Sequence, residues 1–327
     1  MRRDTIKTIA VLTSGGDTPG MNACIRAVYK TGNYFGLNVM GVYHGFAGLM
    51  TGKLERLTDA DFEDSIDKGG TILRTARSEI FRSDEGRRHA MRVAEAYQID
   101  GLVVIGGDGS LTGARELSKL GMPVIGLPGT IDNDLPYTDF TIGFDTAVNS
   151  VVNEIYKIRD TMRSHDRVGV IEVMGRNCGN IALHAGVAGG ADYILVPEVD
   201  AKTGYEKACE TLIANKLRGK LTSIVMIAEG AGGAKDFCDY VRDQTDIEVR
   251  PIVLGYTQRG GNPSAFDRVI ASRMGAHAVQ CLLNGLYNRA VGIKNNRIYD
   301  MDLAEALEVK RDFDYDLYNL NNILAMC

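Results

Sequence analysis

A chain of 327 residues is too long for one ordinary hydrophobic core and suits two α/β domains. Its hydrophobic fraction of 45%, charged fraction of 24% and net charge of −5 are typical of a soluble protein and argue against nucleic-acid binding. The six scattered cysteines form no C-x-x-C pair and the five histidines no paired ligand motif, which argues against zinc and redox sites. Because no long apolar stretch follows the basic N-terminus, we expect a cytoplasmic protein without a signal peptide or membrane span.

Short apolar runs alternate with segments of helical periodicity along almost the whole chain. The runs predict strands, in chain order, at Thr8–Leu12, Val39–Tyr43, Leu102–Ile105, Pro123–Gly126, Val168–Val173, Tyr193–Val196, Thr222–Ile227 and Val249–Leu254. The periodic segments predict helices at Met21–Tyr34, Arg87–Tyr97, Ser110–Lys119, Ala147–Met162, Ile181–Ala188, Tyr205–Leu217, Lys235–Gln244, Ala265–Leu283 and Ala304–Lys310.

This alternation predicts an α/β fold. Strands that are joined by helices form a largely parallel sheet, with both of its faces covered. One sheet containing every predicted strand would be unusually long, so the pattern favours two three-layer α/β/α domains with mostly parallel sheets. We expect the chain to cross between the two domains near Asp139–Phe144.

Glycines and carboxylates follow two of the predicted strands, in Gly106-Gly-Asp-Gly-Ser110 and in Thr130-Ile-Asp-Asn-Asp134. Ligands bind at the carboxyl ends of strands in open α/β sheets, where glycine lets backbone N–H groups approach phosphates. Carboxylates at such a place can hold Mg²⁺ or accept a proton from a hydroxyl. The two loops therefore indicate phosphoryl transfer. The purely structural alternatives are Ser110 as a helix cap and Asp132-Asn-Asp134 as an Asx turn.

A third glycine turn, Ser14-Gly-Gly-Asp17, joins a strand to a helix and predicts an anion site at the helix N-terminus. The alternative is a tight turn with Asp17 as its cap or turn former. Arginines near predicted strand ends supply guanidinium groups suited to a sugar phosphate and ATP: Arg77, Arg167, Arg176, Arg250 and Arg259. Two basic pairs leave a second anion site open, although their spacing alone favours an ordinary charged surface: Arg26 with Lys30, and Arg218 with Lys220.

These loops belong to an ordered series of motifs: Thr13-Ser-Gly-Gly-Asp-Thr-Pro-Gly-Met-Asn22, Gly106-Gly-Asp-Gly-Ser110, Pro128-Gly-Thr-Ile-Asp-Asn-Asp134, Val173-Met-Gly-Arg176, Pro197-Glu198, Leu254-Gly-Tyr-Thr-Gln-Arg-Gly-Gly261 and Asp267-Arg268. In this order they are highly specific. From Ile9 to about Arg297 the chain resembles the bacterial-type ATP-dependent 6-phosphofructokinases, phosphofructokinase family A.

The resemblance implies that Mg-ATP phosphorylates the 1-hydroxyl of fructose 6-phosphate, which gives fructose 1,6-bisphosphate in glycolysis. It implies that Asp108 holds Mg²⁺ and that Asp132 accepts the hydroxyl proton, with Thr130 and Asp134 beside it. Arg77 and Arg176 would stabilise charge on the transferring phosphoryl group. The residues that would bind ATP are Gly16, Arg77, Ser78, Gly107, Asp108, Gly109, Ser110 and Gly113.

The resemblance also implies how the sugar phosphate is bound and how the chain assembles. The sugar site would be lined by Met174, Gly175, Arg176 and Glu229, and the 6-phosphate would be held by Arg167, Arg250, Tyr256 and Arg259. Arg167 and Arg250 would come from a neighbouring subunit, so we expect a homotetramer. We expect residues 1–142 and 257–308 to form the ATP-binding domain and residues 143–256 and 309–327 the sugar-phosphate domain. The active site would lie in the cleft between them.

Two glycines favour ATP over pyrophosphate as the donor. Pyrophosphate-dependent relatives typically carry Asp at the position of Gly109 and Lys at the position of Gly129, and these side chains would crowd or repel part of the nucleotide. At the 6-phosphate site Tyr256 replaces the family's usual histidine, so it can donate a hydrogen bond but adds no positive charge.

The family's effector site would use Arg26, Lys30, Arg159, Asp192, Arg218 and Lys220. Asp59 stands where an arginine usually contacts the effector phosphates, and a like charge there should repel ADP or phosphoenolpyruvate. We therefore expect weakened allostery. Three alternative functions stay open: a pyrophosphate-dependent or other sugar-phosphate kinase of the same family, a catalytically silent regulatory subunit, and a nicotinamide dehydrogenase of similar layout.

Overall fold

The computed structural model describes residues 6–199, 201–310 and 312–325 and divides the chain into two compact units. The first unit contains the described residues up to Thr130, then Leu135–Asp145, and those from Arg259 onward to residue 310. The second contains Ile131–Asp134, Thr146–Gln258 and the described residues from Asp312. The units interleave in the same order as the expected domains, but the short segment Ile131–Asp134 belongs to the second one.

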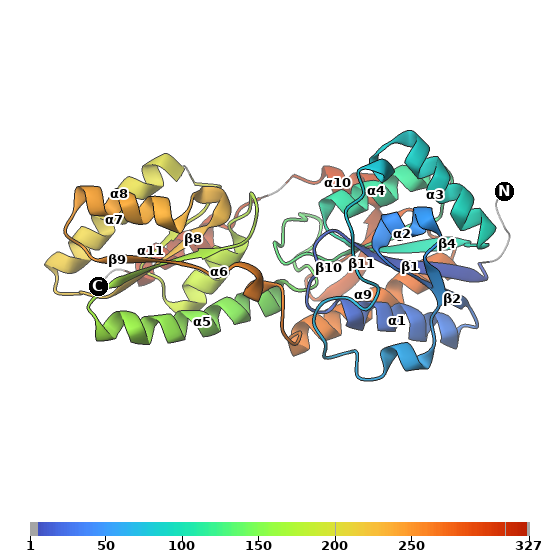
Figure 1. Ribbon diagram of the computed structural model, residues 1–327, viewed down its shortest axis with the longest axis horizontal. Helices are drawn as coiled ribbons and strands as arrows, with labels where there is room; N and C mark the ends of the chain where they lie inside the picture. The colour runs from blue at the N-terminus through green and yellow to red at the C-terminus, as the bar shows by residue number, and fades with distance from the viewer. Residues whose placement is uncertain (1–5, 200, 311, 326–327) are drawn as a thin grey trace. The chain divides into compact units, whose positions relative to one another are not determined.

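The first unit is built on a seven-stranded sheet with the strand order β11-β10-β5-β4-β1-β2-β3 (Figure 1). Its strands are β1 (Thr8–Ser14), β2 (Asn38–Val42), β3 (Leu54–Arg56), β4 (Gly101–Gly106), β5 (Val124–Pro128), β10 (Arg289–Lys294) and β11 (Arg297–Asp302). The pairs from β2 through β10 are parallel, and only the outer strands β3 and β11 run antiparallel to their neighbours among the described residues.

Helices cover both faces of this sheet because successive side chains of its strands point to opposite sides. In β1, Ile9 and Val11 pack into a core with α1 (Met21–Tyr34) and α9 (Ala265–Leu283). Ala10 and Leu12 pack into a second core on the other face. That face is covered by α2 (Gly45–Thr51), α3 (Asp84–Ala96), α4 (Asp108–Lys119) and α10 (Leu303–Glu308).

The second unit has a four-stranded sheet of entirely parallel strands in the order β7-β8-β6-β9. Its strands are β6 (Val168–Val173), β7 (Tyr193–Leu195), β8 (Ser223–Ala228) and β9 (Val249–Val253). One face packs on α7 (Ala201–Leu217) and α8 (Ala234–Gln244) through a core that includes Leu212 and Phe237. The remaining helices of this part of the chain are α5 (Phe144–Ser164), α6 (Asn180–Gly189) and α11 (Tyr315–Leu324).

The predicted α/β fold with mostly parallel sheets is confirmed, and each predicted strand and helix is present with shifted ends in most cases. The sequence analysis missed α2, β3, β10, β11 and α11. β3, β11 and α11 have few buried side chains, so their apolar periodicity is weak. α2 is only seven residues long. β10 is a buried interior strand that was not recognised. Four single turns of 3-10 helix complete the described structure: Asp59–Phe62, Ile80–Arg82, Glu229–Ala231 and Gly255–Gln258. No helix among the described residues is both long and apolar enough to cross a membrane.

Candidate active site

The three predicted glycine loops follow three neighbouring strands of the first unit. Ser14 at the end of β1 pairs with Gly106 at the end of β4, and Gly106 in turn pairs with Pro128 at the end of β5. Because the strands are parallel, all three carboxyl ends open at the same edge of the sheet, which is where open α/β sheets bind ligands. The structure thus brings together three loops, of which the first and the third are more than a hundred residues apart in the chain.

The loop after β4 leads directly into helix α4. The helix begins at Asp108, with Gly107 as its N-cap and no side-chain cap. The alternative role of Ser110 as a cap is therefore wrong, because Ser110 already lies in the first helical turn and is buried. Its side chain instead packs under the neighbouring loops: a Cβ on Gly106 would lie 2.6 Å from Ser110 Oγ, and one on Gly15 3.3 Å from it.

Asp108 and Gly109 are both exposed at the N-terminus of α4. A side chain at Gly109 would have open space, since a Cβ there would meet no described atom within 4 Å. The unpaired N–H groups of a first helical turn attract anions, and an exposed carboxylate beside them suits a hydrated divalent cation bound to phosphates. This end of α4 therefore has the chemistry that Mg-nucleotide binding requires.

The loop after β1 is covered by an arginine from the far end of the chain. Arg259 Nη1 donates a hydrogen bond to the carbonyl oxygen of Asp17 at 3.2 Å, and a Cβ on Gly16 would lie 2.5 Å from that same nitrogen. Only glycine fits there without moving the guanidinium. Asp17 is not the cap of α1, because the N-cap is Gly20 at a φ of +99°. Arg259, which was predicted to contact the sugar phosphate, thus lies on the glycine loop of the first unit.

An aromatic pair borders α4 and was not anticipated from the sequence. The rings of Phe46 and Phe81 are stacked with centroids 4.0 Å apart. A Cβ on Gly113 would lie 3.0 Å from an atom of each ring, so Gly113 keeps α4 close to the pair. Nearby in sequence, Ser78 Oγ accepts a hydrogen bond from the Phe81 N–H at 3.2 Å, and Arg77 is exposed.

The loop after β5 carries the chain from the first unit into the second. Thr130 is buried, and its carbonyl oxygen accepts a hydrogen bond from Thr141 Oγ1 at 2.6 Å. A Cβ on Gly107 would lie 3.6 Å from Thr130 Cβ, so the loops after β4 and β5 touch. Asp132, two residues further on, is 4% exposed and belongs to the second unit.

The Asp132 loop is attached to the second unit by a side-chain hydrogen bond. Asn180 Nδ2, on the first residue of α6, donates to the carbonyl oxygen of Asn133 at 2.7 Å. Asn133 adopts a φ of +50°, a left-handed conformation that asparagine tolerates better than most residues. The Asx-turn alternative and the base assignment for this loop both remain compatible with that conformation.

A small hollow of about 110 Å³ lies in the second unit at the ends of β6, β8 and β9. Three of the predicted sugar-site residues lie on its wall, namely Met174, Glu229 and Tyr256. The rest of the lining consists of Glu172, Val173, Val253 and Gly255. Tyr256 is 83% exposed, so its hydroxyl is available to a ligand at the mouth of the hollow.

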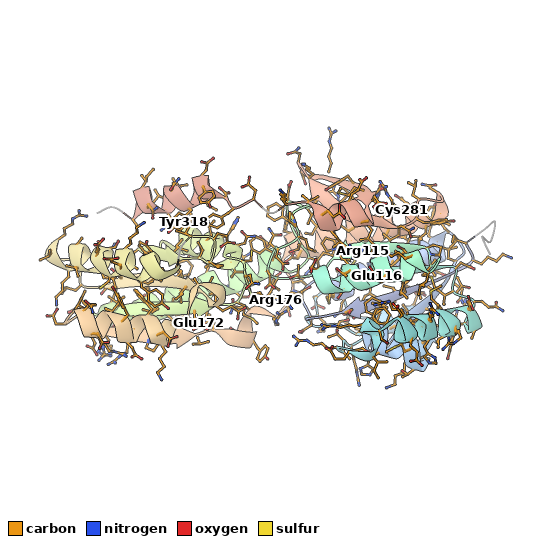
Figure 2. The ribbon with its side chains drawn as sticks, turned by 90° about the horizontal axis from the view of Figure 1, so that it is seen from above. Arg115, Glu116, Glu172, Arg176, Cys281 and Tyr318 are labelled. Carbon is orange, nitrogen blue, oxygen red and sulfur yellow. The ribbon has the colours of Figure 1, made fainter. Side chains whose placement is uncertain are left out.

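A carboxylate holds the turn that follows β6. Glu229 Oε1 accepts hydrogen bonds from the backbone N–H of Gly175 at 3.1 Å and of Arg176 at 2.6 Å. Gly175 has a φ of +142° and Arg176 one of +54°. A left-handed conformation like that of Arg176 is uncommon for residues other than glycine. The Arg176 side chain is exposed beyond the end of β6 (Figure 2). Glu229 therefore holds the backbone of the turn from which the Arg176 side chain extends.

Gln258 supports the same turn and was missed as a site residue, although it stands in the motif before Arg259. Its Oε1 accepts a hydrogen bond from the Met174 N–H at 3.1 Å, while its Nε2 donates to the Gly255 carbonyl at 3.0 Å. The side chain is fully buried. Gln258 thus joins the turn after β6 to the turn after β9.

The predicted phosphate ligands Arg167 and Arg250 meet at one carboxylate. Strands β6 and β9 pair in parallel with Val168 opposite Val249, so Arg167, just before β6, lies near Arg250 on β9. Arg167 Nε is 2.8 Å from Glu248 Oε1, and Arg250 Nη2 contacts the same oxygen. The hydrogen bond and charge of Arg167 hold the pKa of Glu248 below its usual value. The sequence did not reveal this partner, because it depends on the register of the two strands.

Comparison with known proteins decides the family. The phosphofructokinase family model matches residues 8–282. The chain belongs to the phosphofructokinase family. It is 54% identical over 320 residues to proteins named ATP-dependent 6-phosphofructokinase from Clostridium botulinum strain Hall and over 321 residues to one from Alkaliphilus metalliredigens, covering 98% of this chain and 100% of each relative.

Solved phosphofructokinase structures share the fold. The Saccharomyces cerevisiae phosphofructokinase aligns with a TM-score of 0.87 and 36% identity over 98% of this chain, which spans 48% of the yeast chain. A pyrophosphate-dependent phosphofructokinase from Marinobacter aquaeolei aligns with a TM-score of 0.83 at 23% identity over 95% of this chain and 86% of that chain, a likeness of fold alone.

The residues predicted for a phosphofructokinase effector site are engaged with other groups in each unit. In the first unit Lys30 forms an ion pair with Asp59, whose pKa is lowered by the hydrogen bond and charge of that lysine. In the second unit Lys220 Nζ lies 2.5 Å from the buried carboxylate of Asp192. Arg159 donates to the carbonyl oxygens of Gly189 and Gly190. Arg26 is half-buried on α1, and Arg218 is exposed just after α7.

Proposed function

We propose that this chain transfers the terminal phosphoryl group of ATP to the 1-hydroxyl of fructose 6-phosphate. The observation that carries the proposal is the 54% identity, over nearly the whole chain, to relatives named ATP-dependent 6-phosphofructokinase. The chemistry of the site supports it. Phosphoryl transfer relies on positioning and charge neutralisation rather than covalent catalysis, and both units offer groups suited to those tasks.

The first unit supplies the nucleotide site in this proposal. The N–H groups at the start of α4 and the glycine loop after β1 face the phosphates, and Asp108 holds Mg²⁺. Mg²⁺ would neutralise charge on the phosphates of the donor. The fit of this ion rests on the exposed carboxylate of Asp108 beside the open space at Gly109. Arg77 would contribute a further positive charge, while Gly16, Ser78, Gly107, Ser110 and Gly113 shape the site.

The second unit supplies the sugar site and the base. Asp132 takes the proton from the sugar hydroxyl as the oxygen attacks, and Thr130 and Asp134 assist it from the same loop. Met174, Gly175, Arg176 and Glu229 bind the sugar, and Arg176 also stabilises the transferring group. The supporting geometry is the turn after β6, which Glu229 and Gln258 hold in place.

The proposed donor is ATP rather than pyrophosphate. An aspartate at position 109 would fit sterically but would add a negative charge beside Asp108, where phosphates must approach. A lysine at position 129 would be crowded, since a Cβ there would lie 2.9 Å from Ile105 Cγ2 and 3.2 Å from the Gly106 nitrogen. Gly109 and Gly129 are therefore compatible with a bound nucleotide, whereas the Asp and Lys of pyrophosphate-dependent relatives would be unfavourable at these positions.

We also infer a homotetramer. In it, Arg167 and Arg250 of one subunit reach the 6-phosphate bound by Arg259 and Tyr256 of a neighbouring subunit. Glu248 supports this role because it pairs with both arginines just before β9, an edge strand of its sheet. An effector such as ADP or phosphoenolpyruvate would bind weakly, because its phosphates must compete with Asp59 for Lys30. We place the enzyme in the cytoplasm.

A coupled assay of the purified chain with fructose 6-phosphate and Mg²⁺ tests the proposal. We expect turnover with ATP and little with pyrophosphate. Turnover with pyrophosphate but not with ATP would show that pyrophosphate, and not ATP, is the donor. Sugar-phosphate binding without turnover would identify a silent subunit, and reduction of a nicotinamide cofactor without coupling enzymes would identify a dehydrogenase.

A further inference from the structure

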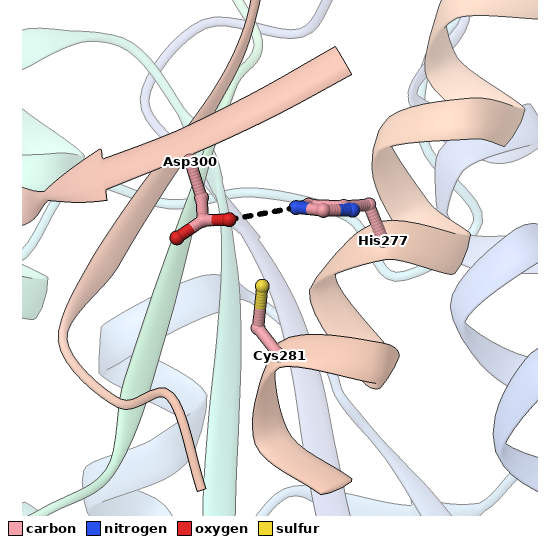
Figure 3. Close-up of side chains that lie close together, drawn as sticks. All are labelled: His277, Cys281 and Asp300. Atoms are coloured by element: carbon pink, nitrogen blue, oxygen red, sulfur yellow. Dashed lines mark hydrogen bonds and ion pairs between the residues drawn. The ribbon is translucent and has the colours of Figure 1, made fainter. Parts of the chain in front are cut away.

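Helix α9 and strand β11 of the first unit bring together three side chains that the proposed reaction does not use (Figure 3). His277 and Cys281 are four residues apart on α9 and therefore share one face of the helix. Asp300 faces them from β11. One ligand atom from each residue lies within 4.8 Å of the other two.

We propose that His277, Cys281 and Asp300 form a binding site for a thiophilic divalent cation of the Zn²⁺ class. In a tetrahedral zinc site, bonds of about 2.0–2.3 Å place neighbouring ligand atoms about 3.3–3.6 Å apart. The three atoms lie within 4.8 Å of one another, so side-chain rotations can bring them to that spacing. Imidazole, thiolate and carboxylate together form a typical zinc donor set.

The surroundings of Asp300 favour this use of its carboxylate. Arg289 Nε donates to Asp300 Oδ1 at 2.6 Å, and Arg289 Nη2 donates to the Asp300 carbonyl at 3.1 Å. The second oxygen, Oδ2, is left facing His277 Nε2 at 2.9 Å. Arg289 therefore fixes the carboxylate from one side, as partners of metal ligands commonly do, while the other oxygen points at the imidazole.

The proton balance of binding follows from the burial of the thiol. Cys281 is 2% exposed, and burial raises the pKa of its thiol to about 12, so without metal the group is protonated. Binding forms the sulfur–metal bond and releases this proton to solvent. His277 is more exposed than Cys281 and offers an entry path from the surface. The thiolate and the carboxylate then bring two negative charges to the cation, of which the carboxylate's is shared with Arg289, and a water molecule can complete the coordination.

This site differs in kind from the nucleotide-associated Mg²⁺ site. Mg²⁺ prefers oxygen ligands, so a sulfur and an imidazole nitrogen select against it. A bound cation would join α9 to the β10–β11 hairpin, and α9 packs on α1 and β5 in the centre of the first unit. We expect the cation to stabilise this unit, since a ligand that binds only the folded state raises its apparent stability.

The test uses the untagged, metal-free full-length chain without nucleotide, titrated with Zn²⁺ and separately with Co²⁺. We expect one saturable equivalent of Zn²⁺ per chain, a raised melting temperature, and a thiolate-to-cobalt charge-transfer band in the near ultraviolet. Cys281→Ala should abolish the band and weaken Zn²⁺ binding by more than about 100-fold, and His277→Gln should weaken it at least about 10-fold. Cys238→Ala, which removes a buried thiol of the second unit, is the matched control and should bind like the unmodified chain.

Three results would overturn the proposal. They are the lack of a saturable equivalent of Zn²⁺, a cobalt complex without the thiolate band, and binding that survives the loss of Cys281 unchanged. If Cys281→Ala fails to fold, the half-buried substitutions His277→Gln and Asp300→Asn still decide the matter, because both must weaken binding.

Discussion

The two units offer different chemistry to the phosphate groups that we propose they bind. In the first unit the predicted site consists largely of backbone at three strand ends, where glycines such as Gly109 leave the N-terminus of α4 open. In the second unit the predicted ligands include arginines close to carboxylates: Glu229 holds the backbone N–H of Arg176, and Glu248 pairs with Arg167 and Arg250. In the proposed function, the nucleotide site thus depends on the absence of side chains at the strand ends, whereas the sugar-phosphate site depends on arginines that lie beside carboxylates.

The largest effect is expected at the proposed base. Asp132→Asn keeps the size of the side chain but cannot accept the hydroxyl proton, so we expect kcat to fall by about 10²–10⁴-fold with little change in the KM for fructose 6-phosphate. Steady-state kinetics with both substrates varied gives both values. Asp139→Asn, in an exposed turn of the first unit, is the control and should retain normal turnover. Near-normal kcat in Asp132→Asn would reject the base assignment.

A substitution at Gly109 tests whether the start of α4 binds the nucleotide phosphates. Gly109→Asp has open space around it and should fold normally, but its charge beside Asp108 should raise the KM for ATP by about 10–100-fold. Asn33→Asp, at an exposed position near the end of helix α1, controls for the added charge. If Gly109→Asp leaves the KM for ATP unchanged, the start of α4 does not bind the phosphates.

A substitution at Glu229 tests whether the turn after β6 binds the sugar phosphate. Glu229→Ala removes the acceptor of two backbone N–H groups, so the turn carrying Arg176 loses its support. Hydrogen bonds to charged groups contribute about 1.5–3 kcal/mol each, so we expect the KM for fructose 6-phosphate to rise by at least about 10-fold. The KM for ATP should change little. Glu210→Ala, on helix α7 of the same unit, is the control, and equal effects on both substrates in Glu229→Ala would contradict the assignment.

These predictions rest on features that the sequence showed to different degrees. Apolar runs and the glycines after them predicted β4, β5 and their loops, because both signals are local. Glu248 was missed, since its contact with Arg167 depends on strand register. The cluster at Cys281 was missed for the same reason, although the four-residue spacing of His277 and Cys281 was a local signal for a shared helix face. The alternative role of Ser110 as a helix cap was wrong, because the helix starts two residues earlier, at Asp108.

The smallest expected effect concerns the effector response. Asp59→Asn removes the partner of Lys30, so we expect sensitivity to ADP or phosphoenolpyruvate to increase a few-fold. The pKa of Asp59 is lowered in the folded chain, so the ion pair is present at neutral pH and is lost only as the pH falls through that depressed pKa. The difference between Asp59→Asn and the unmodified chain should therefore stay constant from about pH 6 to 8. A response to effectors that Asp59→Asn leaves unaltered would show that Lys30 does not bind them.

The most direct test of the division between the units is equilibrium binding, which is independent of turnover. Dissociation constants for a non-hydrolysable Mg-ATP analogue and for fructose 6-phosphate should be measured on the unmodified chain, Gly109→Asp and Glu229→Ala. The account predicts a crossed pattern, in which Gly109→Asp weakens only the nucleotide and Glu229→Ala weakens only the sugar phosphate. The reverse pattern, or equal weakening of both ligands by both substitutions, would contradict it.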